Sequence, residues 1–211
     1  MLRAELDRLL AQTSLSVSEL QRDQLIGFLQ LLHKWNKAYN LTSVREPLQM
    51  VGRHLLDSLV VGPYLQQPDC QRIIDVGTGP GLPGVPLAIL FPEKHFVLLD
   101  SLGKRIRFLN EVKRQLGLTN IEPLQSRVED HQPQQSYDAV LSRAFASLND
   151  MLHWCQHLPA SQGRFLAMKG AAVEEEIAAL ADFVRVTAVH TLKLPEQDAE
   201  RYLVELKKIT A

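Results

Sequence analysis

The sequence predicts an α/β fold, in which a mostly parallel seven-stranded sheet with an antiparallel edge follows an N-terminal helical segment. Three observations predict this fold. Apolar residues recur at helical spacing through the first 66 residues, short apolar runs alternate with helical patterns after residue 71, and the last two strand-like runs have no helix between them. Such alternation is typical of βαβ units, whose parallel strands are covered by helices on both faces.

The N-terminal segment carries the signals of capped amphipathic helices. Ser18 can cap a helix start, with Gln21 three residues on as its capping-box partner. The apolar residues that follow at helical spacing are Leu25, Phe28, Leu29, Leu32, Trp35 and Tyr39. Pro47 suits the first turn of another helix. We therefore expect a helical cap over residues 1–66 and a sheet domain over residues 67–211, packed as one compact unit.

The elements of the sheet domain follow from short apolar runs and from the helical patterns between them. The expected strands are Arg72–Val76, His95–Asp100, Ile121–Gln125, Tyr137–Ser142, Arg164–Met168, Val184–Leu194 and Arg201–Lys208. The expected helices are Val85–Phe91, Lys104–Leu116, Leu148–Leu158 and Val173–Phe183. Because no helix separates the last two strands, we expect them to form a hairpin that gives the sheet an antiparallel edge.

Composition narrows the classes of protein further. The chain has 23 Lys plus Arg against 24 Asp plus Glu, and 45% of its residues are hydrophobic, which excludes a disordered chain. No apolar run approaches the ~18 residues of a membrane span, and the N-terminus lacks a signal-peptide pattern, so we expect a cytoplasmic protein. Cys70 and Cys155 lie far apart, which predicts reduced thiols and no metal site.

The glycine-rich segment Asp75–Gly84 follows the first expected strand and precedes the first helix of the sheet. It contains the spacing G-x-G-x-x-G at Gly79, Gly81 and Gly84. Pro80 and Pro83 remove backbone donors that a pyrophosphate needs, and the carboxylate of Asp75 would repel phosphates. S-adenosylmethionine fits this loop better, because it carries a sulfonium and an amino group and no phosphate.

Further polar residues follow the next strands. Asp100 ends the second strand, where a carboxylate can accept hydrogen bonds from ribose hydroxyls. Ser126–Asp130 follows the third strand, where an adenine would be held, and Arg143 follows the fourth. These residues predict a nucleoside cofactor without choosing its type. A nucleotide-dependent oxidoreductase therefore remains the alternative to a methyltransferase.

The sequence lacks the residues that several kinds of methyl transfer need. The loop after the fourth strand reads Ser-Arg-Ala-Phe rather than Asn/Asp-Pro-Pro-aromatic, which argues against methylation of exocyclic amines. Cys70 lies before the first strand and Cys155 lies inside a predicted helix, and neither has a His or acid placed to activate it, which argues against attack by a cysteine nucleophile. A nucleophile with a free lone pair, such as guanine N7, needs no general base, and positioning can supply most of the catalysis.

Two basic clusters predict contact with RNA. The first contains Lys34, Lys37, Arg45 and Arg53, with Trp35 and Tyr39 interleaved. The second contains Lys104, Arg105, Arg107, Lys113 and Arg114. Local basic excess neutralises phosphates, and aromatic rings can stack on unpaired bases. The alternative is that the charges form solvated helix faces and that the aromatic rings belong to the apolar stripe.

The chain resembles one known family over nearly its whole length. The matching stretches are His33–Thr42, Arg53–Ser58, Asp75–Gly84, Leu99–Arg105 and Ser142–Leu148. They are similar to the RsmG family, also called glucose-inhibited division protein B, the bacterial 16S ribosomal RNA guanine-N7 methyltransferases. The resemblance implies a class I methyltransferase, Rossmann-like with an N-terminal helical cap. It also implies methyl transfer from S-adenosylmethionine to one guanine near the decoding site.

The resemblance also implies roles for individual residues. The positions that match its cofactor-binding residues are Gly77, Leu82, Val128, Glu129 and Arg143, to which the strand-end reasoning adds Asp100. We expect His54 and Lys169 near the target base, and His54 could equally be a structural hydrogen-bonder. The RNA-binding candidates are Lys34, Lys37, Arg53, Lys104 and Arg105. The expected partner is 16S RNA or a small-subunit particle, bound by a monomer; a ribosome-binding module without activity is a further alternative.

Overall fold

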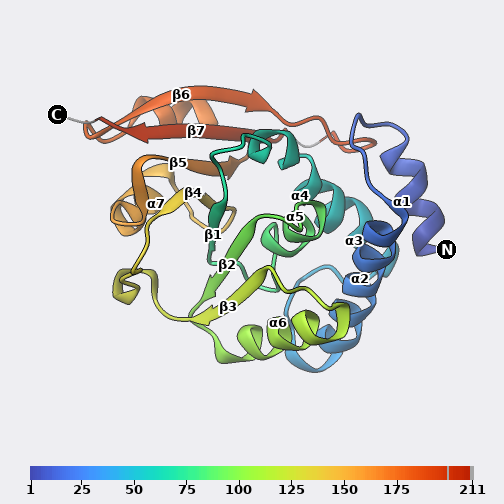
Figure 1. Ribbon diagram of the computed structural model, residues 1–211. Coiled ribbons are helices and arrows are strands. Elements are labelled where there is room, and N and C mark those ends of the chain that lie inside the picture. The colour runs from blue at the N-terminus through green and yellow to red at the C-terminus, as the bar shows by residue number, and fades with distance from the viewer. Residues whose placement is uncertain (199, 210–211) are drawn as a thin grey trace.

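The computed structural model describes residues 1–198 and 200–209, and its centre is a seven-stranded sheet (Figure 1). The strands are β1 (Arg72–Val76), β2 (His95–Asp100), β3 (Ile121–Gln125), β4 (Tyr137–Ser142), β5 (Pro159–Lys169), β6 (Val184–Thr191) and β7 (Tyr202–Lys208). Their order across the sheet is β3-β2-β1-β4-β5-β7-β6. The first five strands are parallel, and β7 is antiparallel to both of its neighbours, β5 and β6. The predicted sheet and its hairpin edge are therefore confirmed.

The strand order reverses between β1 and β4, which lie side by side at the centre of the sheet. In open parallel sheets, the loops on either side of such a switch point diverge and leave a crevice at the carboxyl ends of the strands. The loop after β1 is the glycine-rich segment, and the loop after β4 begins with Arg143. The topology therefore places these two loops on opposite sides of one crevice.

Both faces of the sheet are buried, and alternate residues of a strand point to opposite faces. Ile73 belongs to the apolar core on one face and Ile74 to the core on the other. The first core contains residues of α5 (Gly84–Leu90) and α6 (Gly103–Leu116), and the second contains residues of α7 (Leu148–Cys155) and α8 (Val173–Ala178). This division explains why β1 reads as a continuous apolar run rather than as an alternating one.

The N-terminal helices extend the first core. They are α1 (Leu2–Leu10), α2 (Glu19–Tyr39), α3 (Pro47–Met50), η1 (Val51–Leu56), α4 (Asp57–Leu59) and η2 (Gly62–Leu65). Their apolar side chains share one continuous core with those of the sheet, and Figure 1 shows them gathered beside α5 and α6. The predicted capping box of Ser18 and Gln21 is confirmed. The division of the chain at residues 66 and 67 remains a prediction.

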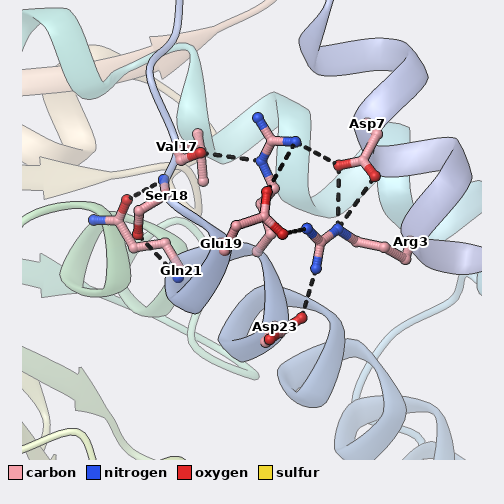
Figure 2. A network of polar contacts seen from close by, with 8 residues as sticks. Arg3, Asp7, Val17, Ser18, Glu19, Gln21 and Asp23 are labelled. Atoms are coloured by element: carbon pink, nitrogen blue, oxygen red, sulfur yellow. Dashed lines mark hydrogen bonds and ion pairs between the residues drawn. The ribbon is translucent and has the colours of Figure 1, made fainter.

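Ion pairs join the first two helices (Figure 2). The carboxylate of Asp7 accepts hydrogen bonds from Arg3 Nε at 3.2 Å and from Arg22 Nη1 at 2.8 Å. Arg3 also pairs with Glu19 and Asp23 at the start of α2. These side chains are partly or largely exposed, so the network fastens α1 to α2 at modest gain in stability.

Two helices end earlier than the sequence predicts. The predicted helix Val173–Phe183 stops at Ala178, because the amide side chain of Asn149 bonds to the backbone of Ala179 and Ala181 and turns the chain. The predicted helix Leu148–Leu158 stops at Cys155. There the next element, β5, begins with Pro159, and a residue that precedes proline is driven out of the helical conformation.

The helical segment that begins at Pro47 changes pitch within a few residues. It passes from α3 into η1, a π-helical turn, and then into α4. A π turn carries one extra residue and commonly occurs at functional sites. In the same segment, Ser58 Oγ donates to the carbonyl of His54 at 2.6 Å.

Among the described residues, no helix has the length and apolar character needed to cross a membrane.

Candidate active site

Two cavities lie at the carboxyl edge of the sheet and share one residue, Phe145. The small cavity, of about 260 Å³, is lined by Val76, Gly77, Leu99, Asp100, Ser101, Arg105, Ser126, Arg127, Val128, Glu129, Ala144 and Phe145. The large cavity, of about 910 Å³, is lined by residues 42–44, 53, 54, 57, 143, 145, 146, 168–172, 176, 196, 197 and 201. The shared phenylalanine makes the loop after β4 the boundary between the two.

The small cavity depends on Gly77, the first residue after β1. Its φ is +68°, which L side chains rarely adopt, and a Cβ atom there would lie 2.8 Å from Cβ of Ala144. Its backbone nitrogen donates to the carbonyl of Leu99 at 2.9 Å. Glycine therefore lets the loops after β1 and β4 meet closely beside the end of β2.

Asp75 fixes the shape of the glycine-rich loop from beneath. Its side chain is buried, and Oδ2 accepts hydrogen bonds from Thr78 Oγ1 at 2.7 Å and from the backbone nitrogen of Gly84 at 2.8 Å. Burial raises the pKa of Asp75 to about 6, although these two hydrogen bonds oppose the shift. Its other oxygen, Oδ1, is buried without a partner in the described residues, and Asp75 lines neither cavity.

Asp100 occupies the end of β2, where the sequence places a ribose acceptor. Oδ2 accepts from the backbone nitrogen of Gly79 at 2.9 Å and from Arg105 Nη1 at 3.0 Å, and Oδ1 accepts from the backbone nitrogen of Leu102 at 2.9 Å. An ionised carboxylate has about four acceptor positions, so one remains for a ribose hydroxyl. Arg105, an RNA-binding candidate by sequence, lines the small cavity and pairs with Asp100.

Leu82 has a side chain buried in the core, so only its backbone can meet a ligand. Its nitrogen already donates to the carbonyl of Thr78 at 2.9 Å. Its carbonyl is left available by Pro86, which stands four residues on in α5 and has no N–H to donate. Leu82 lines neither cavity, so its cofactor-binding role stays a prediction that depends on the carbonyl oxygen.

The residues expected around an adenine also line the small cavity. Val128 and Glu129 belong to the short helical turn η3 (Val128–Asp130), which follows β3. The side chain of Val128 is buried in the second core, and Arg127 Nε donates to Glu129 Oε1 at 2.8 Å. Arg143, by contrast, lines the large cavity, one residue before Ala144 of the small one. The site roles of all these residues remain predictions.

His54 lines the large cavity, but both of its ring nitrogens are engaged. Nδ1 lies 3.0 Å from the carbonyl of Arg53, and Nε2 lies 2.9 Å from Thr42 Oγ1. A carbonyl only accepts, so Nδ1 carries the proton and Nε2 accepts from the threonine hydroxyl. Burial lowers the pKa of His54 to about 4, so the ring is neutral at pH 7. This arrangement favours its role as a structural hydrogen-bonder.

Lys169 is also held within the protein. Its Nζ donates to the carbonyls of Phe145 at 3.3 Å and Ala146 at 3.2 Å, and it pairs with Glu176 at 2.9 Å. Glu176 in turn accepts from the backbone nitrogen of Leu148 at 2.7 Å, at the start of α7. Lys169 therefore fixes the loop that separates the cavities rather than reaching freely toward a base.

The basic candidates on α2 lie outside both cavities. Lys34 and Lys37 are exposed, and Lys104 Nζ donates to the carbonyl of Tyr39 at 2.9 Å, close to the loop that supplies residues 42–44 of the large cavity. Trp35 packs against Phe108 with ring centroids 5.6 Å apart. Trp35 is partly buried and packs against the core, as in the alternative interpretation of the aromatic residues. Tyr39, by contrast, is 41% exposed.

The two cysteines do not take part in the site. Cys70 and Cys155 are both free and buried, and neither lines the small or the large cavity. Burial raises the pKa of both thiols, that of Cys155 to about 12. In the part of the chain that the structure describes, no cluster of His, Cys, Asp and Glu could hold a metal ion.

Sequence reasoning missed three residues of the large cavity wall, Asp57, Glu176 and Arg201. The sequence signal for Asp57 is its place in Arg53–Ser58, one of the stretches that carry the family resemblance. The other two gave none, because their contacts join segments that are distant in sequence.

A family model described as rRNA small subunit methyltransferase G matches residues 21–204. The chain belongs to this GidB family. Members of the family named ribosomal RNA small subunit methyltransferase G are similar over nearly their full length. The protein from Aliivibrio fischeri is 60% identical over 206 residues, which cover 97% of each chain. The protein from Yersinia enterocolitica is 59% identical over 204 residues, which cover 96% of this chain and 98% of that one.

Solved structures confirm the predicted fold class. Coclaurine N-methyltransferase, solved with N-methylheliamine and SAH, superposes with a TM-score of 0.55 at 15% identity, covering 90% of this chain and 73% of that one. Identity this low bears on the fold alone. GidB family membership together with this fold makes the chain an S-adenosylmethionine-dependent methyltransferase.

Proposed function

We propose that this GidB-family chain transfers the methyl group of S-adenosylmethionine to N7 of a single guanine near the decoding site of bacterial 16S ribosomal RNA. The observation that carries the proposal is the pair of cavities that meet at Phe145. One cavity has the residues of a nucleoside site, and the other is wide enough for a base and has arginine in its wall. A methyl group that passes between two bound molecules needs such a junction.

The small cavity fits the cofactor in its polar groups. Asp100 lines this cavity and keeps one acceptor position for a ribose hydroxyl. In this proposal, Gly77, the Leu82 carbonyl, Asp100, Val128, Glu129 and Arg143 hold the cofactor. When bound, S-adenosylmethionine supplies an electrophilic methyl group on a sulfonium.

The large cavity fits a reaction without a general base. Guanine N7 has a free lone pair, so its bond to the methyl carbon forms as the sulfonium bond breaks, and no proton has to leave. His54 and Lys169 line this cavity, and both are already bound to protein groups. What the chain contributes is therefore position and a fixed loop between the two reactants.

The RNA substrate would approach over the N-terminal helices. Lys34, Lys37 and Arg53 are exposed, and Arg53 lines the large cavity itself. Together with Lys104 they would neutralise phosphates around the target nucleotide. The proposal includes a monomeric, cytoplasmic enzyme whose substrate is 16S RNA or a small-subunit particle.

Transfer of a labelled methyl group tests the proposal. Small subunits from cells that lack this protein are incubated with the chain and labelled S-adenosylmethionine, and the labelled nucleotide is mapped by strand scission at N7-methylguanine. We expect one labelled guanine in 16S RNA. Label elsewhere, or none, contradicts the proposal. Calorimetry with S-adenosylmethionine and NAD separates it from an oxidoreductase, and cofactor binding without transfer would indicate an inactive ribosome-binding module.

A further inference from the structure

Three segments that are distant in the sequence meet at one buried carboxylate, that of Asp57. Oδ2 accepts from Arg143 Nη1 at 2.8 Å, and Oδ1 accepts from Arg201 Nε at 3.2 Å. The Asp57 side chain is only 6% exposed, whereas those of Arg143 and Arg201 are 31% and 37% exposed. All three residues line the large cavity.

The carboxylate is held in place from its own segment. Asp57 follows the π-helical turn η1, whose end is fixed by the bond from Ser58 Oγ to the carbonyl of His54. The ring of His54 is fixed in turn by Thr42 and by the Arg53 carbonyl. A carboxylate anchored in this way is a rigid acceptor, and its two oxygens set where the two guanidinium groups lie.

The two arginines line the same cavity but come from different segments of the chain. Arg143 directly follows β4 and precedes Ala144 and Phe145, which line the small cavity. Arg201 precedes β7, the strand that pairs with β5. Without the carboxylate between them, two guanidinium groups would face each other in a half-buried place, where like charges repel.

We infer that Asp57 is a positioning residue for methyl transfer, which holds Arg143 toward the cofactor and Arg201 toward the RNA. The inference rests on the proposed function. It means that the N-terminal helical segment completes the active site rather than only covering the sheet. A charged, buried acceptor that faces the cavity would not be needed for packing alone, since buried ion pairs seldom add stability over apolar residues of the same volume.

Asp57→Asn tests the inference, with Asp7→Asn as the matched control. Asp7 also accepts from two arginines, one on α1 and one on α2, but it lies on α1 and lines neither cavity (Figure 2). For Asp57→Asn we expect the Kd for S-adenosylmethionine to rise at least fivefold and kcat/KM for RNA methylation to fall at least tenfold. For Asp7→Asn we expect both within twofold of the wild type.

A double-mutant cycle separates positioning from a general structural role. If Asp57 acts on the cofactor through Arg143, the Kd of Asp57→Asn/Arg143→Gln equals that of Arg143→Gln within twofold. Arg201→Met should lower kcat/KM for RNA and leave the cofactor Kd unchanged. If Asp57→Asn lowers the folded fraction, Asp57→Glu replaces it. This variant keeps the charge, and we expect at least a threefold rise in the Kd at a thermal midpoint near that of the wild type.

A folded Asp57→Asn or Asp57→Glu protein with a cofactor Kd within twofold of the wild type would overturn the inference. Multiplicative effects in the double-mutant cycle would also overturn it. The cofactor Kd is measured without RNA. If wild-type protein binds S-adenosylmethionine but methylates no RNA, the proposed function fails while the inference about Asp57 and Arg143 is still decided.

Discussion

The two cavities differ in how the chain builds them. The small cavity takes its walls from loops that follow consecutive parallel strands, β1 to β4, within residues 76–145. The large cavity gathers residues from the helical segment at 42–57, the loop after β4, the end of β5 and the C-terminal region at 196–201. The first is a local product of the sheet topology. The second exists only when the N-terminal helices and the C-terminal hairpin are both in place.

Gly77→Ala should have the largest effect on cofactor binding, and it tests how the small cavity is built. A Cβ atom there would meet Cβ of Ala144 at 2.8 Å, and the positive φ adds strain of about 1 kcal/mol. We expect the affinity for S-adenosylmethionine, measured by calorimetry, to fall at least 30-fold, because the loops around the small cavity must separate.

Gly79→Ala is the matched control for that substitution. Gly79 also has a positive φ, +60°, but a Cβ atom there has no heavy atom within 4 Å. Both substitutions therefore strain the backbone, but only Gly77→Ala brings a Cβ atom against Ala144. For Gly79→Ala we expect the affinity for S-adenosylmethionine to fall less than tenfold. Equal losses in the two variants would show that strain alone, and not the contact with the loop after β4, limits cofactor binding.

Asp100→Ala should have the next largest effect. It removes the ribose acceptor and leaves the backbone nitrogens of Gly79 and Leu102 without their partner, so cofactor binding should weaken by about 1–3 kcal/mol. RNA affinity, measured without cofactor, should change little because Asp100 does not line the large cavity. An unchanged cofactor affinity would refute the ribose role.

The sequence predicts the small cavity far better than the large one, and the reason is physical. Asp75, Gly77 and Asp100 stand at strand ends, and a strand end in a parallel sheet has a known place relative to a ligand. The partners of Asp57 are 86 and 144 residues away, so their meeting depends on how helices pack and not on a local pattern. Asn149 ends α8 for the same kind of reason, through a contact that no helical periodicity contains.

Asp75, beneath the glycine-rich loop, and His54, in the large cavity, should make stability depend on pH in opposite directions. The raised pKa of Asp75, about 6, contributes stability that is present below pH 4 and is lost as the pH rises through 6. The lowered pKa of His54, about 4, works in the opposite direction: stability is present above pH 6.5 and is lost as the pH falls toward 4. Each contribution is on the order of 3 kcal/mol.

Urea unfolding between pH 4 and 6.5 measures the two contributions separately. Asp75→Asn keeps an oxygen for Thr78 and Gly84 but cannot ionise, so its free energy of unfolding should rise with pH more steeply than that of the wild type. His54→Gln should show a shallower rise or a fall. Parallel curves for the wild type and either variant would show that the group in question does not titrate in this range.

The smallest expected effect concerns the exposed lysines that would guide RNA to the large cavity. Lys37→Gln removes one exposed charge from α2. Since each phosphate contact changes the slope of log affinity against log salt by about 0.7 for single strands, we expect the slope to decrease by about that amount and the affinity to fall less than threefold. Lys193→Gln, an equally exposed lysine that lines neither cavity, is the control and should leave the slope unchanged. The chain has 23 basic against 24 acidic residues, and each of the two substitutions changes this total equally. A slope that depends on Lys37 but not on Lys193 must therefore arise from where the charges lie. Equal slopes in all three proteins would place the RNA path elsewhere on the surface.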